Sequence, residues 1–227
     1  MKISILTLFP EMFKGPFDYS IIKRARNEKI VDIELINLRD FGIGKHKIVD
    51  DKPYGGGSGM ILKVDVLDKA IKFIKNKNKT RKHKVILLSA QGKTFNQKLA
   101  KSYSRSDHII LISGHYEDYD TRIKEFIDDE ISIGDFILTG GELPAMIITD
   151  CIIRLLPKVL KKGVTDNESF SEYLEFPQYT KPNIYKNLKV PEILKSGNHK
   201  KIKEWRLEKS IELTKKIRPD LLKKKDL

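Results

Sequence analysis

The chain is most distinctive at Ser132-Ile133-Gly134-Asp135-Phe136-Ile137-Leu138-Thr139-Gly140-Gly141-Glu142-Leu143-Pro144, which lies between a polar turn and a long apolar run. Glycine supplies positive φ angles and lets backbone approach backbone or a ligand closely, so we expect two sharp turns within a packed segment. The apolar side chains between those turns, from Phe136 to Leu138, are expected to be buried. A buried main chain has to satisfy its N–H and C=O groups, and a small ligand rich in polar edges is one candidate partner.

A plainer interpretation of the same stretch is a strand, a Gly-Gly turn and a helix that Pro144 opens. Residue spacing alone does not separate this interpretation from a ligand-binding turn. Both therefore stay open at this point.

Length and composition indicate a soluble globular protein with one large domain, or a main domain and a smaller satellite. The chain has 227 residues, of which 40% are hydrophobic and 33% charged, and this length allows a sizeable core. No apolar run approaches the ~20 residues that a membrane span needs, and the N-terminus has no signal-peptide pattern. The single cysteine, Cys151, can form no internal disulfide, and we expect it to be a core residue in a reducing cytoplasm.

The charge favours a polyanionic partner such as nucleic acid. The chain has 44 Lys and Arg against 31 Asp and Glu, a net charge of +13. Residues 181–227 hold 15 Lys and Arg against 6 acids, so +9 of this charge lies in the last 47 residues. The chain is also rich in Lys, Ile and Asn together, a bias that coding composition can impose without any binding role.

Alternating strand and helix patterns predict a parallel α/β sheet in the first part of the chain. Strands are expected at 1–9, 31–38, 85–88 and 109–112, and helices at 21–28, 64–74 and 96–104. The continuous apolar run Val85 to Leu88 is typical of a strand buried on both faces. Residues 39–60 form a long, polar, glycine-rich segment, and a structureless loop of that length is usually functional or disordered.

Three polar turns are expected after strands, at 89–92, 114–117 and 132–141. Ligands bind outside the carboxyl ends of the strands in open parallel sheets, so we expect these turns to converge on one small molecule. Backbone atoms of buried loops give directional hydrogen bonds without charge, which suits an adenine and ribose better than a triphosphate. In addition, Gly92-Lys93-Thr94 imitates a phosphate-binding loop but lacks the glycine required five residues earlier, where Leu87 stands.

An ordered series of motifs resembles that of the bacterial tRNA (guanine-N1)-methyltransferases and covers nearly the whole chain. The motifs of the first two thirds are Phe9 to Phe13, Asp51 to Met60, Leu88 to Gly92, Gly114 to Glu117 and Ser132 to Pro144. Those of the last third are Pro177 to Pro182, Val190-Pro191, Ser196 to His199 and Trp205-Arg206. Such an order is far more specific than any one motif.

The resemblance implies a SPOUT-type α/β fold, a parallel sheet whose C-terminal part is tied in a trefoil knot, acting as a homodimer. We expect a knotted catalytic domain over 1–160, a flexible polar linker over 161–171 and a small, mostly helical, tRNA-binding domain over 172–227. Helices are expected at 192–196 and 202–214. The second of these has four apolar residues available for packing: Trp205, Leu207, Ile211 and Leu213.

The resemblance also implies S-adenosylmethionine as cofactor, held by residues of the three turns. These residues are Leu88, Ser89, Gly92, Gly114, Tyr116, Glu117, Ile133, Gly134, Asp135, Phe136, Ile137, Leu138, Gly140 and Gly141. Residues expected to contact the tRNA are Asp50, Tyr54, Gly55, Gly57, Gly59, Ser169, His199 and Arg206. The resemblance hints at magnesium but assigns no ligand to it.

The reaction that the family performs is methyl transfer to N1 of the guanine immediately 3′ to the anticodon, position 37. N1 of guanine carries a proton near neutral pH, so a general base has to remove it, and the developing negative charge spreads to O6. Arg154, the only charged residue from Cys151 to Pro157, suits the stabilisation of O6. The alternative for Arg154 is a side chain that snorkels from the edge of an apolar helix.

The general base is expected at Glu168, where the family has Asp before Ser-Phe. Glu has one more methylene than Asp, so its carboxylate has to be held differently, and Asp166 is a competing candidate. Asp118 is a second departure, at a position where the family usually has Gly.

Two other functions remain as alternatives. A basic RNA-binding protein without catalysis would use its glycine turns only as structure, and calorimetry with S-adenosylmethionine separates it from an enzyme. A methyltransferase of the common open-sheet type is disfavoured, because Leu8-Phe9-Pro10 stands where its glycine-rich turn would follow the first strand.

Overall fold

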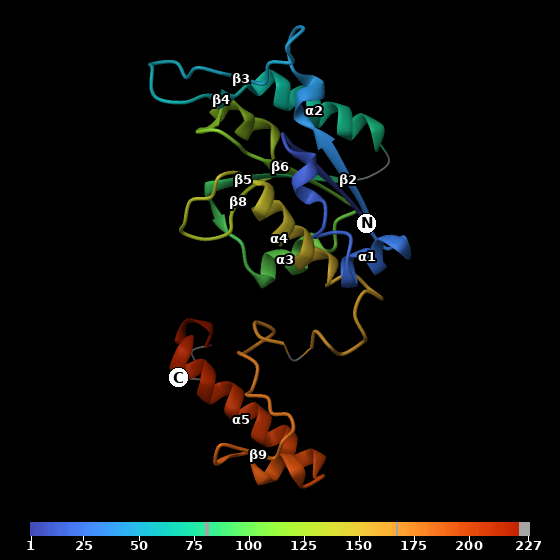
Figure 1. The fold of residues 1–227 in the computed structure, drawn as a ribbon, viewed down its shortest axis with the longest axis vertical. Helices are drawn as coiled ribbons and strands as arrows, with labels where there is room; N and C mark the ends of the chain where they lie inside the picture. The colour runs from blue at the N-terminus through green and yellow to red at the C-terminus, as the bar shows by residue number, and fades with distance from the viewer. Residues whose placement is uncertain (80–81, 167, 223–227) are drawn as a thin grey trace. The chain divides into compact units, whose positions relative to one another are not determined.

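The chain divides into two compact units, residues 1–160 and 161–227, each described by itself below (Figure 1). The computed structural model describes residues 1–79, 82–166 and 168–222. Within these ranges, no helix combines the length and the apolar character that crossing a membrane requires.

A five-stranded sheet forms the centre of the first unit. Its strands are β1 (Lys2–Thr7), β2 (Asp32–Asn37), β5 (His83–Thr94), β6 (His108–Ser113) and β8 (Asp129–Ser132), in the order β2-β1-β6-β5-β8. All four neighbouring pairs are parallel. The parallel α/β sheet predicted from the sequence is confirmed.

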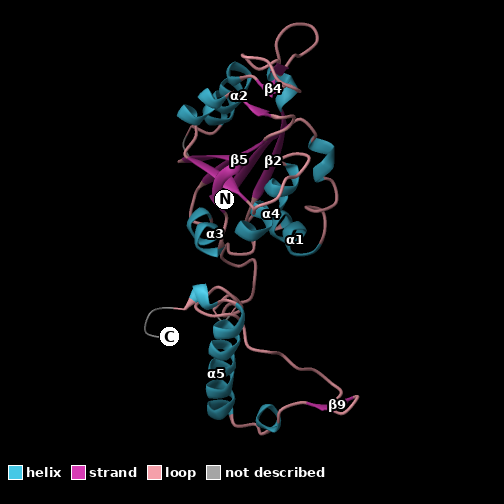
Figure 2. Ribbon diagram, turned by 90° about the vertical axis from the view of Figure 1, so that its left-hand side faces the viewer, coloured by secondary structure: helices cyan, strands magenta, loops and turns pink. Residues whose placement is uncertain are grey.

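Helices cover both faces of this sheet (Figure 2). Helix α2 (Val64–Lys77) lies on one face, and α1 (Ser20–Asn27), α3 (Gln97–Tyr103) and α4 (Glu142–Ile153) lie on the other. Successive residues of a strand point to opposite faces, and β5 shows this clearly: Val85 and Leu87 belong to the core under α2, whereas Ile86 and Leu88 belong to the core under α4.

A smaller three-stranded sheet occupies part of the long polar segment. Strand β3 (Asp50–Asp51) pairs antiparallel with β4 (Ile61–Leu62), which pairs parallel with β7 (Asp118–Tyr119). The short helix η2 (Leu38–Phe41) precedes it. The segment 39–60 is therefore not entirely structureless, because η2 opens it and β3, within it, pairs with β4.

Strand β5 also departs from the prediction, which ended it at Leu88. After pairing Leu88 with Ile131, the chain makes an excursion through residues 89–92 and then pairs Lys93 with the same Ile131. Thr94 continues the ladder opposite Ser132. The expected polar turn is thus an interruption inside one long strand, because both sides of it hydrogen-bond to β8.

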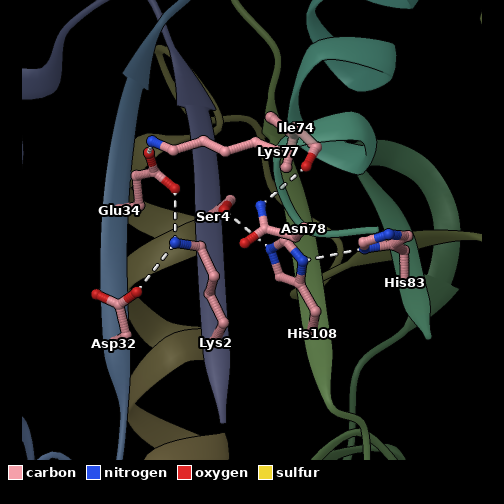
Figure 3. A network of polar contacts seen from close by, with 9 residues as sticks. All are labelled: Lys2, Ser4, Asp32, Glu34, Ile74, Lys77, Asn78, His83 and His108. Carbon is pink, nitrogen blue, oxygen red and sulfur yellow. Dashed lines mark hydrogen bonds and ion pairs between the residues drawn. The ribbon is translucent and has the colours of Figure 1, made fainter. Parts of the chain in front are cut away.

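Two polar networks lie at the amino edge of the sheet (Figure 3). Lys2 pairs with Asp32 at 2.9 Å and with Glu34 at 2.8 Å, and Lys77 from α2 reaches the other oxygen of Glu34. Burial opposes ionisation of Glu34, yet hydrogen bonds from both lysines outweigh it and lower the pKa of this carboxyl. These ion pairs connect β1, β2 and α2.

The second network is a chain of three side chains with a buried histidine at its centre. His108, fully buried, contacts Ser4 Oγ through Nε2 at 2.9 Å and His83 Nδ1 through its own Nδ1 at 3.0 Å. Two imidazole nitrogens that face each other can share only one proton, so both rings cannot be charged in this arrangement. Burial, followed by the charge of Lys75, lowers the pKa of His83.

We expect the stability of the first unit to fall as the pH drops below about 6.5, the ordinary pKa of histidine. The pKa of His83 is lower in the folded protein than in the unfolded chain, so on acidification the unfolded chain binds a proton first. The neutral His83 therefore contributes its full stabilisation at higher pH, and this stabilisation is lost as the pH falls. His83→Gln should flatten the fall in unfolding midpoint between pH 7.5 and 5.5. His46→Gln, at an exposed loop position, is the control, and equal slopes in both variants would contradict the prediction.

The second unit is built around helix α5 (His199–Ile217). It also contains η4 (Glu192–Lys195), η5 (Pro219–Leu221) and a hairpin of β9 (Ile184–Tyr185) with β10 (Leu188–Lys189). Both predicted helices are present. Leu207, expected to pack, is 54% exposed, and the buried positions of α5 are instead Ser210 and Thr214. The buried hydroxyl of Thr214 is satisfied, because it accepts a hydrogen bond from Leu174 N–H and donates one to Ser210 C=O.

Candidate functional site

A pocket of about 280 Å³ opens at the carboxyl edge of the five-stranded sheet, beside the excursion of β5 and the ends of β6 and β8. Three segments line it, and they correspond to the three turns that we expected to converge. The lining residues are Leu88 to Gln91, Gly114 to Tyr119, Ile131 to Gly134, Phe136 to Gly141, and Pro144.

Most residues expected to hold the cofactor lie on this lining. They are Leu88, Ser89, Gly114, Tyr116, Glu117, Ile133, Gly134, Phe136, Ile137, Leu138, Gly140 and Gly141. Gly92 and Asp135 are not among them. A Cβ added at Gly92 would lie 2.4 Å from the backbone nitrogen of Ile131, so this glycine allows β5 to return closely to β8.

The apolar side chains expected to be buried are exposed. Phe136, Ile137 and Leu138 are 54%, 83% and 36% exposed. They belong to a loop that follows the last residue of β8, Ser132, and the described layers of the first unit leave these side chains exposed. Apolar composition predicted burial in the core, whereas these side chains instead line the mouth of a pocket.

The glycines of this loop act in two different ways. Gly134 has a φ of +148°, a conformation that side chains disfavour. Gly140 and Gly141 have no positive φ and instead permit close contact: a Cβ at Gly141 would lie 2.7 Å from Gly114 N, and Gly141 N–H donates to Gly114 C=O at 2.7 Å. The second and third turns are therefore in direct backbone contact.

The plainer interpretation placed the start of the following helix at Pro144. Helix α4 begins two residues earlier, at Glu142, directly after Gly141. Its apolar run is buried against β1 and β6 through residues such as Ala145, Ile148 and Ile152. Cys151 is half-buried and not a full core residue, and burial raises the pKa of its thiol.

Charged side chains support the floor of the pocket. The Tyr119 hydroxyl donates to Glu130 at 3.1 Å, and Lys124 pairs with the same carboxylate at 3.0 Å. Burial raises the pKa of Tyr119. Burial also opposes ionisation of Glu130, but hydrogen bonds from Lys124, Ser89 and Tyr119 outweigh it and lower the pKa of that carboxyl. An ionised carboxylate, paired with Lys124, thus contacts two residues of the pocket lining, Ser89 and Tyr119.

Asp118, the departure from the family pattern, lies within strand β7. Its carboxylate accepts from the side-chain amide of Gln91 at 3.4 Å, and its own backbone pairs with Ile61. The residue therefore joins the first and second turns through its side chain.

The loop of residues 50–62 reaches the pocket at one end. Glu117 N–H donates to Met60 C=O at 3.1 Å, and a Cβ at Gly59 would lie 2.3 Å from Glu117 Cγ. Tyr54 is fully exposed, and Gly55 has open space around it. Gly57 meets only Pro53, and Asp50 is half-buried in β3. Gly59, one of the expected tRNA-contacting residues, is thus in contact with the pocket lining.

The expected catalytic residues belong to two different units. Arg154 follows α4 as its C-terminal cap and is half-buried. Glu168 and Asp166 belong to the second unit, in a segment of turns, where Glu168 is half-buried and Asp166 exposed.

The remaining expected tRNA-contacting residues also belong to the second unit. Ser169 Oγ accepts from Glu175 N–H at 3.0 Å. His199 is the first residue of α5 and is exposed. Arg206 places its guanidinium 4.7 Å from the ring centroid of Phe176, so one face of this cation is already stacked.

Several residues around the pocket were not predicted. Thr139, His115 and Tyr119 line it, and Arg39 reaches the Tyr116 hydroxyl at 3.4 Å. Glu142 is 1% exposed. The sequence indicated Glu142 as a candidate, because it stands directly before a long apolar run, and a carboxylate buried there needs a polar partner.

Metal ligands do not gather in the described part of the chain: residues 1–79, 82–166 and 168–222 contain no group of three or more His, Cys, Asp or Glu side chains suited to hold an ion.

Comparison with known proteins gives a consistent family. The family model described as tRNA (Guanine-1)-methyltransferase TrmD matches residues 1–224. A protein of Clostridium beijerinckii named tRNA (guanine-N(1)-)-methyltransferase is 54% identical over 226 residues, 99% of this chain and 93% of that protein. Proteins with the same name from Dictyoglomus turgidum and Mycoplasmopsis synoviae are 51% and 49% identical, and the matches cover 100% and 99% of this chain and 92% and 98% of those proteins.

Proposed function

Because this chain belongs to the tRNA (guanine-1)-methyltransferase family, as its motifs led us to expect, we propose that it methylates N1 of a guanine in tRNA. The guanine is the one immediately 3′ to the anticodon, position 37, and the methyl donor is S-adenosylmethionine. The pocket at the meeting point of three turns is the observation that carries the proposal.

The pocket residues fit an adenosine-like cofactor. Gly140 and Gly141 allow the turns to pack closely on one another, and apolar residues such as Leu88 and Ile133 line the pocket that the turns enclose. A site of backbone groups and apolar surface suits a planar base with polar edges. When bound, S-adenosylmethionine supplies an electrophilic methyl group on a positively charged sulfur. The residues that hold it would be those of the three turns.

The chain's own residues have to prepare the guanine. A general base removes the proton from N1, which frees the lone pair that attacks the methyl group. Glu168 is the proposed base, with Asp166 as its competitor. Arg154 is proposed to stabilise the negative charge that develops on O6, because a guanidinium is charged at all relevant pH values and planar.

We expect Arg154→Ala to lower kcat by roughly 100-fold or more, the usual loss when one group that stabilises a developing charge is removed. The KM for S-adenosylmethionine should change little, because the charge develops only in the transition state. Arg154→Lys should recover part of the loss, since it restores the charge but not the planar fork. Steady-state kinetics with unmodified tRNA and labelled methyl donor measure these values.

Arg105→Ala is the matched control, because Arg105 is exposed and lies just before β6, at the opposite edge of the sheet. It removes the same charge far from the pocket. Equal activities of the two alanine variants would exclude Arg154 from the reaction.

Mass spectrometry of the tRNA tests the proposed function directly. Unmodified tRNA is incubated with the protein and S-adenosylmethionine, digested with nucleases and sequenced by mass. One added methyl group on the guanine 3′ to the anticodon, with the retention time of 1-methylguanosine, is the expected result. Methylation of another base or another guanine atom would overturn the proposal.

Calorimetry separates the enzyme from a non-catalytic RNA-binding protein. S-adenosylmethionine should bind with measurable heat and raise the unfolding midpoint, as any ligand of the native state does. Absence of both effects would favour the binding protein.

The finer architecture is also part of the proposal. We infer a SPOUT fold with a trefoil knot in residues 1–160, supported by the close packing of the three turns on one another. We further infer a homodimer in the cytoplasm, a linker over 161–171 and a tRNA-binding domain over 172–227. The excess of Lys and Arg after residue 180 supports this last role, since cations that neutralise phosphates dominate nucleic-acid affinity.

A further inference from the structure

Glu142 has an environment that the proposed reaction does not explain. It is 1% exposed and is the first residue of α4, so its carboxylate lies at the positive end of the helix. Its Oε1 accepts a hydrogen bond of 2.8 Å from the hydroxyl of Thr7, the fully buried last residue of β1. That hydroxyl in turn accepts from Phe9 N–H at 2.9 Å. One carboxylate oxygen thus connects α4 to the end of β1.

The second oxygen, Oε2, faces the pocket turn that contains His115. A Cβ added at Gly140 would lie 2.4 Å from Glu142 Oε2 and 2.8 Å from His115 Nδ1. Both atoms therefore border the same small space, which only a glycine at position 140 leaves free. His115 Nδ1 is buried and has no hydrogen-bond partner among the described residues. A buried polar atom without a partner is costly, and a carboxylate oxygen beside it offers a partner after a small movement.

The ring of His115 is held from the sides as well. The Phe9 ring packs edge-on against it with centroids 4.8 Å apart, and the Tyr116 ring lies 5.1 Å away. His115 and Tyr116 both line the pocket. The orientation of the imidazole therefore affects the shape of the pocket wall.

We propose that Glu142 is a positioning residue: it accepts a hydrogen bond from His115 Nδ1–H and so locks the 114–117 turn against the Gly140-Gly141 turn and the end of β1. In this arrangement His115 carries its proton on Nδ1, and its Nε2 is left as an acceptor. A carboxylate that accepts from an imidazole fixes both the tautomer and the orientation of the ring. The inference rests on the proposed function in one respect, namely that the pocket holds the methyl donor.

The tautomer can be measured without any assay of activity. Nitrogen-15 NMR of histidine-labelled protein distinguishes a protonated Nδ1 from a protonated Nε2. The chain has 5 His, and the resonance that disappears in His115→Asn identifies His115. We expect an Nδ1-protonated ring in the wild type and a change of tautomer in Glu142→Gln, because the amide nitrogen can take the place of Oε2 and donate to Nδ1. An Nε2-protonated His115 in the wild type would overturn the inference.

A pair of substitutions at His115 gives a kinetic readout that survives if Glu142→Gln fails to fold. The amide nitrogen of Asn can occupy the place of Nδ1 and donate to Glu142, whereas the longer Gln places its amide near Nε2. The KM for S-adenosylmethionine should therefore be about tenfold higher in His115→Gln than in His115→Asn, the size expected from one hydrogen bond to a charged group. Equal KM values in the two variants would contradict the inference.

The two proposals fail in different ways. A protein that methylates guanine N1 but has an Nε2-protonated His115 would overturn only the role of Glu142. A protein with Nδ1-protonated His115 that leaves tRNA unmethylated would overturn only the proposed function.

Discussion

Glu168→Gln should lower kcat for tRNA methylation by about 100-fold or more, the usual contribution of a general base. The amide has nearly the same size as the carboxylate but cannot take the proton from guanine N1. The KM for S-adenosylmethionine should stay close to that of the wild type, since the cofactor is proposed to lie among the three turns of the first unit. Steady-state and single-turnover kinetics with labelled methyl donor measure both values.

The local structure around Glu168 makes the substitution interpretable. The backbone carbonyl of Glu168 accepts hydrogen bonds from Ser171 N–H at 3.0 Å and from Ser171 Oγ at 2.7 Å. These bonds do not involve the Glu168 side chain, so the turn should survive the change to Gln.

Asp166→Asn is the control, because Asp166 is an exposed carboxylate two residues away. Its activity should stay within about threefold of the wild type, since a surface carboxylate outside the reaction contributes little. The opposite pattern, an active Glu168→Gln and an inactive Asp166→Asn, would transfer the role of base to Asp166. Glu168→Asp, which restores the residue usual in the family, should keep most of the activity.

Hydrophobic periodicity was sufficient to predict the sheet and most helices, because those patterns are local. The run Val85 to Leu88 indicated a strand buried on both faces, and its side chains divide between the two cores. Helix α2 was predicted over 64–74 and extends to Lys77. In both cases the periodic pattern of apolar residues shows which side chains face the core.

Where the prediction was wrong, a distant segment decided the structure. Strand β5 continues to Thr94 because polar residues after the excursion pair again with β8, about 40 positions later in the chain, and no local pattern reveals that partner. Phe136 to Leu138 were expected in the core because they are apolar, yet burial depends on whether a layer covers them. Composition says which residues favour burial, but not where the layers end.

In the candidate site, too, features that depend on local sequence could be predicted and contacts between distant residues could not. Convergence of the three turns could be predicted, because the carboxyl ends of parallel strands meet at one edge. The interaction between Thr7 and Glu142 could not, because it joins residues 135 positions apart in the sequence. The resemblance to a family assigned Gly92 to the cofactor, and the structure adds a constraint that the resemblance did not indicate: this glycine of β5 lies against the backbone of β8.

Gly92→Ala should therefore act on stability first. The added Cβ would lie 2.4 Å from Ile131 N and 2.6 Å from Glu130 C, and these backbone atoms of β8 cannot rotate away. Separating β5 from β8 would also loosen the core at Ile131, which is 1% exposed. Overpacking of this kind costs about 1–3 kcal/mol, so we expect the unfolding midpoint to fall by roughly 4–10 °C in scanning calorimetry.

Gly114→Ala is the matched control, a glycine of the neighbouring turn without a positive φ. Its added Cβ would meet Leu88 C=O at 3.5 Å and the Tyr119 ring at 3.6 Å, which is ordinary van der Waals contact. Its midpoint should stay within about 2 °C of the wild type, as for substitutions that create no overlap. If Gly92 instead served mainly to contact the cofactor, Gly92→Ala would weaken binding of S-adenosylmethionine and leave the midpoint unchanged. That outcome would contradict the packing role, because a strand pair forced apart by a methyl group cannot keep its stability.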